Sequence, residues 1–146
     1  MNHFSEVSKQ RLQSCHRDLQ LLFAHVIIDM DCTIVCGHRD KEAQDKAFSE
    51  GKSKLTYPRS KHNHIPSWAV DAAPYENGRI DWGREQLLFF AGYVKGIADQ
   101  LYRIGTMSHR IRLGADFSGD NDINDEKFRD ENHFELIPNE KDLKIS

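Results

Sequence analysis

A segment rich in histidine, SKHNHIPSWAVDAAPY at residues 60–75, carries three side chains of the kinds that bind metal ions. His62 and His64 lie in a polar stretch that also contains prolines, and Asp71 lies in the apolar stretch that follows. A catalytic zinc ion takes about three protein ligands from His, Asp, Glu or Cys and keeps an open position for water. The segment therefore offers part of a hydrolytic zinc site, and the remaining ligand must come from elsewhere in the chain.

A second segment, DENHFEL at residues 130–136, offers that ligand together with an acid. If the segment forms a strand, His133 and Glu135 point to the same face and Phe134 points to the core. Asp130 then lies in the preceding turn, where its carboxylate can reach a water molecule at the metal and act as a general base. Glu135 either holds His133 by its second ring nitrogen or is an ordinary polar residue of the strand.

These motifs and their order resemble the zinc-dependent D-Ala-D-Ala carboxypeptidase and L-alanyl-D-glutamate endopeptidase family. The similar pieces are S-x-H at residues 60–62, A-x-D followed by a proline, and D-x-x-H-x-E late in the chain. Upstream, GHRDKEAQ at residues 37–44 is similar to the family's G-x-R-x-x-x-x-Q segment. NGRIDW and RLGADF are similar to segments of phage and prophage endolysins of this family. The resemblance therefore rests on several motifs in the same order and extends from Gly37 to Glu135.

The resemblance implies a role for each matching residue. His62, Asp71 and His133 are the expected Zn2+ ligands. Asp130 is the expected general base, and Arg39 is expected to face the substrate carbonyl, where a fixed cation would stabilise an oxyanion. Gln44, the last residue of the upstream motif, is expected to have a structural role.

The spacing of the histidines leaves a choice for the first ligand. The shorter family pattern has the interval found between His64 and Asp71, whereas His62 lies two residues further from the aspartate. The serine at position 60, and the SKHN-x-x-PS-x-AVD form of phage relatives, favour His62. We therefore predict that His62 binds the metal, with His64 as the alternative.

The activity that the resemblance implies is zinc-dependent hydrolysis of the peptidoglycan stem peptide between L-Ala and D-Glu. The alternatives are a D-Ala-D-Ala carboxypeptidase and a catalytically inactive zinc-containing module that binds the cell wall, but the presence of Asp130 favours an enzyme. A phage endolysin of this kind causes cytolysis from the cytoplasm of the host bacterium. We expect a separate export route, because the first twenty residues lack the apolar core of a secretory signal.

Two other patterns suggest different chemistry. The letters HNH at residues 62–64 match the name of a nuclease motif, but that motif is spread over a hairpin and a helix. The acidic run DFSGDNDINDE at residues 116–126 suggests calcium, because hard cations bind several oxygens. It lacks the spacing of a calcium-binding loop. We therefore predict a solvated acidic loop, with a second metal site as the alternative.

Composition limits the remaining possibilities. The chain has 146 residues, of which 38% are hydrophobic and 29% charged, and its net charge is -3. These values predict one soluble domain, residues 1–146, that acts as a monomer without nucleic-acid or membrane partners. The three cysteines, Cys15, Cys32 and Cys36, do not form a CxxC pair. They predict neither a disulfide framework nor a structural zinc site.

The pattern of apolar residues predicts the elements that position these side chains. It indicates helices over residues 5–26, 41–50 and 84–104, and strands over residues 33–37, 69–73, 109–117 and 133–137. Ser5 is a suitable cap for the first helix, and the tail from Pro138 onward is expected to fray. The order predicts an α+β fold in which helices flank a small antiparallel sheet.

Overall fold

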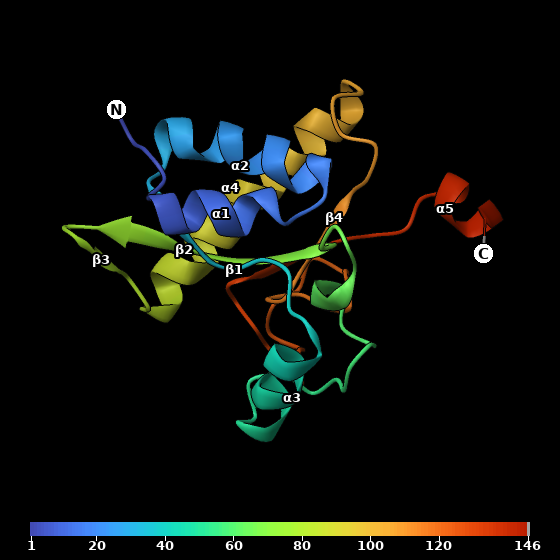
Figure 1. Cartoon of the computed structure of the whole chain (residues 1–146). Coiled ribbons are helices and arrows are strands. Elements are labelled where there is room, and N and C mark those ends of the chain that lie inside the picture. Colours follow the sequence, from blue (N-terminus) through green and yellow to red (C-terminus); the bar gives the residue numbers. More distant parts are fainter. Residues whose placement is uncertain (146) are drawn as a thin grey trace.

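A small antiparallel sheet lies at the centre of the computed structural model, which describes residues 1–145 (Figure 1). Its order is β1 (Cys32–Cys36), β2 (Ala69–Glu76), β5 (His133–Leu136) and β4 (Ile111–Leu113). A short strand, β3 (Arg79–Ile80), pairs with the far end of β2. The described residues thus form the predicted α+β domain, with the helices α1 (Glu6–Gln13), α2 (Arg17–Asp29), α3 (Lys41–Ser49), α4 (Arg84–Arg103) and α5 (Glu140–Ile145).

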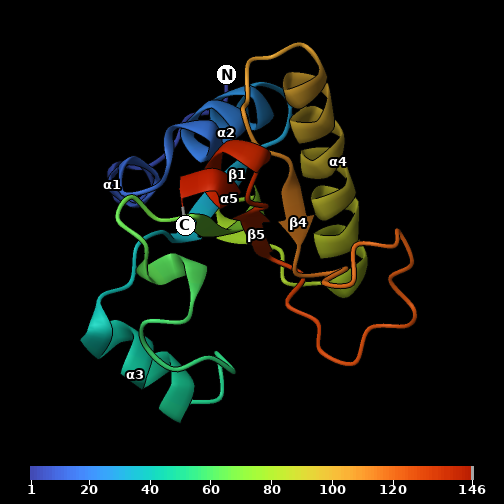
Figure 2. The same cartoon turned by 90° about the vertical axis from the view of Figure 1, so that its right-hand side faces the viewer.

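The two faces of the sheet have different surroundings. Helices α1, α2 and α4 lie on one side, whereas α3 and the long loops lie on the other (Figures 1 and 2). Phe134 of β5 contacts Phe23 of α2 and Phe90 of α4, with ring centroids 5.7 and 6.0 Å apart. All three rings are fully buried, and burial of large apolar side chains is the main stabilising contribution to such a core. The opposite face of the sheet is left for polar side chains.

The prediction of a single helix over residues 5–26 is wrong, because the chain breaks between α1 and α2. Ser5 caps α1 as predicted. At the break, His16 accepts a hydrogen bond on Nδ1 from the backbone N–H of Asp18 and so caps α2. The backbone of His16 donates to Ser67, and that of Ser67 donates to Ser14. The break therefore ties the two helices to the segment that leads into β2.

The tail contains a helix that was not predicted, because Glu140–Ile145 form α5. Asn139 and Asp142 cap this helix reciprocally, each side chain accepting from the other's backbone N–H. The Asp142 carboxylate is also 2.8 Å from Nε2 of His109, which is buried. The sequence did not predict this helix, and the expectation that the tail frays stays a prediction.

The other predicted elements agree with the structure apart from their ends. Helix α4 matches the prediction, and α3 is followed by Gly51 in the left-handed conformation, as a glycine after a helix often is. The strand predicted over residues 109–117 is only β4, because the chain turns at Gly114. Within the described residues, no helix combines the length and apolarity needed to span a membrane.

Candidate active site

The pairing of β2 with β5 places Asp71 directly opposite His133. Directly opposed residues of an antiparallel pair point to the same face. His133 Nδ1 accordingly lies 3.0 Å from Asp71 Oδ1, and both residues are buried. Their neighbours Val70 and Phe134 are also opposed, and both are buried in the core. The alternation expected for His133, Phe134 and Glu135 is therefore present.

His62 approaches the same aspartate from a 3-10 turn, η1 (Lys61–Asn63). Ser60 and Asn63 close this turn as a capping box, which explains the serine of the S-x-H motif. His62 Nδ1 donates to the Gly37 carbonyl at 2.7 Å, and Nε2 lies 3.2 Å from Asp71 Oδ1. The hydrogen bond to Gly37 therefore leaves Nε2 facing the aspartate.

His64 is not part of this cluster. Its side chain is exposed, and its ring lies against Trp68 with centroids 5.4 Å apart. Of the two histidines considered from the sequence, only His62 is brought to Asp71.

Glu135 holds His133 from the opposite side of its ring. Its Oε1 is 2.9 Å from His133 Nε2, and its Oε2 contacts Lys61 at 2.9 Å and Arg112 at 2.7 Å. Burial alone would raise the pKa of Glu135, but the hydrogen bonds from His133 and Lys61 outweigh burial and hold that pKa well below its usual range. A charged carboxylate in this position fixes the ring so that Nδ1 faces Asp71.

Asp130 lies beside the cluster because the turn before β5 packs on Gly114. The Asp130 N–H donates to the Gly114 carbonyl at 2.9 Å, and a Cβ at position 114 would collide with the Asp130 carbonyl. The carboxylate of Asp130, a carboxylate oxygen of Asp71 and a ring nitrogen of His133 lie within 4.8 Å of one another. Burial, and then the charge of Asp71, raise the pKa of Asp130 to about 6. An acid with that pKa can both accept and release a proton near neutral pH.

Arg39 reaches the cluster from the segment before α3. Its guanidinium lies 3.3 Å from Asp71 Oδ2 and donates to Gln44 Oε1, also at 3.3 Å. Gln44 is fully buried and donates to Ser53 and Leu55 in the loop after α3. The predicted structural role of Gln44 therefore agrees with its contacts.

Cys36 was not among the predicted site residues, yet it lies opposite Asp71 in the pairing of β1 with β2. The register of β1 shifts between Ile34 and Cys36, so simple alternation along that strand does not indicate where the sulfur points. Cys36, His62 and Asp71 offer potential ligand atoms within 4.8 Å of one another. The Cys36 sulfur, however, is 3.9 Å from His62 Nδ1, the nitrogen turned away from Asp71.

The potential ligand atoms around Asp71 can hold a divalent metal ion.

The chain is similar to proteins whose activity is known. Residues 1–137 match the family described as phage L-alanyl-D-glutamate peptidase. The chain belongs to this family. The L-alanyl-D-glutamate peptidase of Escherichia phage T5 is 32% identical over 139 residues, which cover 92% of this chain and 97% of that protein. The crystal structure of the L-Ala D-Glu endopeptidase ChiX of Serratia marcescens has the same fold, with a TM-score of 0.70 over 93% of this chain and 91% of that one, at 19% identity.

Family membership confirms the activity class predicted from the motifs. The protein is an L-alanyl-D-glutamate peptidase, a hydrolase of the peptidoglycan stem peptide. Cleavage between L-Ala and D-Glu is thus preferred to the alternative activity, that of a D-Ala-D-Ala carboxypeptidase.

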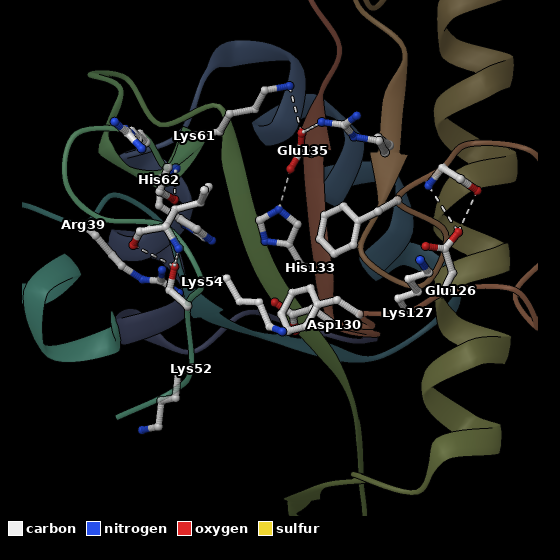
Figure 3. Close-up of a pocket in the computed structure, with 18 of the residues that line it drawn as sticks. Arg39, Lys52, Lys54, Lys61, His62, Glu126, Lys127, Asp130, His133 and Glu135 are labelled. Carbon is white, nitrogen blue, oxygen red and sulfur yellow. Dashed lines mark hydrogen bonds and ion pairs between the residues drawn. The ribbon is translucent and has the colours of Figure 1, made fainter. Parts of the chain in front are cut away.

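A cavity of about 630 Å³ opens above the cluster and gives the peptidase room for a peptide (Figure 3). Arg39, His62, Asp130, His133 and Glu135 all contribute to its wall. The loop after α3, the loop from Phe117 to Asp130, Lys61 of η1 and Arg112 of β4 form the remaining walls. The chemical groups named above therefore lie together at one side of a space that is open to solvent.

Two further groups of potential metal ligands occur elsewhere in the described part of the peptidase. His109 joins Asp18 and Asp142 at 2.8 Å on its two ring nitrogens, with His16 beside it, and this network anchors α5. Asp116, Asp120 and Glu126 come together in the acidic loop, where Asp116 accepts backbone hydrogen bonds from within the loop. That this acidic loop is simply solvated, without a second metal ion, stays a prediction.

Proposed function

We propose that this peptidase cleaves the L-Ala–D-Glu bond with the help of a zinc ion held by His62, Asp71 and His133. The observation that carries this proposal is the approach of two imidazole nitrogens to one buried carboxylate oxygen, at 3.2 and 3.0 Å. Donors in a tetrahedral zinc site with bonds of about 2.0–2.1 Å lie roughly 3.3 Å apart. The observed separations are close to that value, and two histidines with one carboxylate are a common donor set of catalytic zinc.

When bound there, zinc would polarise the scissile carbonyl and lower the pKa of a water molecule. Asp130 would accept the proton of the attacking water and then donate it to the amine of the departing glutamate residue. Its raised pKa, about 6, supports both steps, because neither direction of transfer then meets a large barrier.

Arg39 and Glu135 would assist this proton transfer without taking part in it. The Arg39 guanidinium is fixed by Asp71 and Gln44, so its positive charge would lie beside the carbonyl oxygen as negative charge develops there. Glu135 would keep the second ligand histidine, His133, in orientation through the hydrogen bond to Nε2.

We also propose that the peptidase works as a monomer, reaches the wall from the host bacterial cytoplasm by a separate export route, and causes lysis as an endolysin. The family match and the phage origin of the T5 relative support the role as an endolysin.

Purified peptidoglycan tests the proposed reaction directly. The protein, loaded with zinc, is incubated with the polymer, and the released peptides are analysed by mass spectrometry. New L-Ala carboxyl ends and glutamate amino ends are expected, and protein stripped of metal serves as the control. Released free D-Ala without new glutamate amino ends would contradict the assignment and indicate a carboxypeptidase.

A further inference from the structure

The walls of the cavity carry an excess of positive charge. Seven Lys and Arg side chains contribute to it, against four Asp and Glu, although the chain as a whole has a net charge of -3. Such a concentration of one sign in a cleft attracts a ligand of the opposite sign. Only a cation that is not already paired within the protein is available to bind such a ligand.

Most of the cations near the reacting groups are already paired. Arg39 contacts Asp71, and Lys61 and Arg112 both contact Glu135. Lys52, at the rim, contacts Glu50 at 3.1 Å. Lys52, Lys61 and Arg112 are therefore paired by the protein itself, and Arg39 has its role at the carbonyl oxygen under the proposed function, so none of the four is left for a second substrate anion.

Lys54 differs, because an aromatic ring holds its ammonium group and no acid pairs with it. Lys54 lies at the wall of the cavity (Figure 3). Its Nζ is 4.8 Å from the centroid of the Phe128 ring. Phe128 is stacked on Phe117 at 5.8 Å, and Phe117 in turn lies 5.7 Å from the ring of His133. Among residues 1–145, no side chain forms an ion pair or hydrogen bond with the Lys54 ammonium. A ring face attracts the cation but leaves its three N–H donors unused.

The other unpaired cations of the cavity have no such anchor. Arg59 and Lys127 are exposed, as Lys54 is, but they form no side-chain hydrogen bond, ion pair or ring contact within the described residues. A side chain without a contact that holds it loses more conformational entropy on binding a ligand than one that is already held against a ring. Lys54 is therefore the better placed of the three.

Lys54 contacts the loop that leads to Asp130. Its partner Phe128 lies two residues before Asp130, which under the proposed function donates a proton to the leaving amine. That amine belongs to the glutamate residue. Glutamate has two carboxyl groups and the peptide continues through only one of them, so the other is a free anion at neutral pH.

We propose that Lys54 is a specificity-determining residue that binds the free carboxylate of the glutamate on the leaving-group side. This inference rests on the proposed function, because it takes the side of the cleft from the role of Asp130. The ion pair forms with the bound substrate and persists in the transition state. It should therefore act mainly on KM and leave kcat nearly unchanged.

Two matched stem peptides test this inference. In one the free glutamate carboxyl is intact, and in the other it is an amide of nearly the same size. The wild-type protein should cleave the acid with about tenfold higher kcat/KM than the amide, the scale of a hydrogen bond to a charged group. Lys54→Met should lose about tenfold on the acid and little on the amide, so that the ratio falls to about one. Lys54→Arg should restore most of the preference.

Lys52→Met is the control, because this lysine is two residues away and already pairs with Glu50; it should keep the wild-type ratio. Equal cleavage of acid and amide by the wild type would overturn the proposal, and so would an equal loss on both peptides in Lys54→Met. If the acid-to-amide ratio of kcat/KM falls in Lys127→Met but not in Lys54→Met, then Lys127 binds the carboxylate and the assignment to Lys54 is refuted. Failure of the zinc-loaded wild type to cleave either peptide would instead contradict the proposed function.

Discussion

Replacement of Asp130 by asparagine is the sharpest test of the reaction proposed for this peptidase. Asparagine has almost the same size and can still hydrogen-bond to water, but it cannot accept a proton at neutral pH. The backbone contacts that place residue 130, with Gly114 and His133, do not involve its carboxylate. The variant should therefore fold normally and keep its metal, because His62, Asp71 and His133 are unchanged.

The expected size of the effect follows from the role and the pKa. Loss of a general base typically lowers kcat by about 10² to 10⁴. Burial and the charge of Asp71 raise the pKa of Asp130 to about 6. A base acts in its ionised form, so the wild-type rate should increase with pH through this pKa. In the metal-free protein, about nine-tenths of Asp130 is ionised at pH 7 and about one-tenth at pH 5, which corresponds to a roughly tenfold decrease between them. A bound dication lowers this pKa and moves the decrease to lower pH.

The assay measures kcat and KM on a stem peptide from pH 4.5 to 8, with metal content and melting temperature on the same samples. Asp130→Asn should lose kcat, keep KM, and lose the acidic limb of the profile. Glu131→Gln is the matched control, because within residues 1–145 the one ion pair of that neighbouring carboxylate is with Arg84, at 3.6 Å. If Asp130→Asn loses its metal, Asp130 is a metal ligand. If the melting temperature falls while kcat is retained, Asp130 has only a structural role in the turn. Near-normal kcat in Asp130→Asn would refute the mechanism.

Three further predictions concern the metal. Protein purified without chelator should contain about one zinc per chain by elemental analysis, and chelation should abolish activity that added zinc restores; full activity without metal would exclude the zinc site. His62→Ala should lose zinc and activity while His64→Ala keeps both, and the reverse pattern would show that the wrong histidine was chosen. Glu135→Gln should weaken zinc affinity about 10- to 100-fold, measured by competition with a chelator. Unchanged affinity would mean that the hydrogen bond to His133 does not matter for binding.

The differences between predicted and observed helices have a common physical cause. Leu12, Cys15 and Leu19 are all buried, so the apolar stripe continues through the break between α1 and α2, and periodicity alone predicts one helix. The break depends on hydrogen bonds with Ser67, about fifty residues away. Helix α5 likewise depends on His109, a partner distant in sequence. Local pattern detects which residues are buried, but it does not detect such distant partners.

The choice between the two histidines was also beyond spacing arguments. Counting residues to Asp71 favours His64, because the count assumes a uniform path between ligand and strand. In the structure, the capping box of Ser60 and Asn63 forms a tight turn that presents His62, and the Gly37 carbonyl fixes its ring. The serine before the histidine therefore indicated which histidine lies beside Asp71, since its side chain forms the turn. That His62 binds the metal stays a prediction.

The register of β2 joins the site to the core. Asp71 lies opposite Cys36 on one side and opposite His133 on the other, so it occupies the middle of three adjacent strands. A slip of one residue would turn Asp71 into the apolar core and place Val70 or Ala72 beside the histidines. The slip is opposed by the burial of Val70 and Phe134, which are fully enclosed on the other face. The apolar side chains that stabilise the fold thus also hold the proposed metal ligands in position, because alternation along the strand assigns both sets at once.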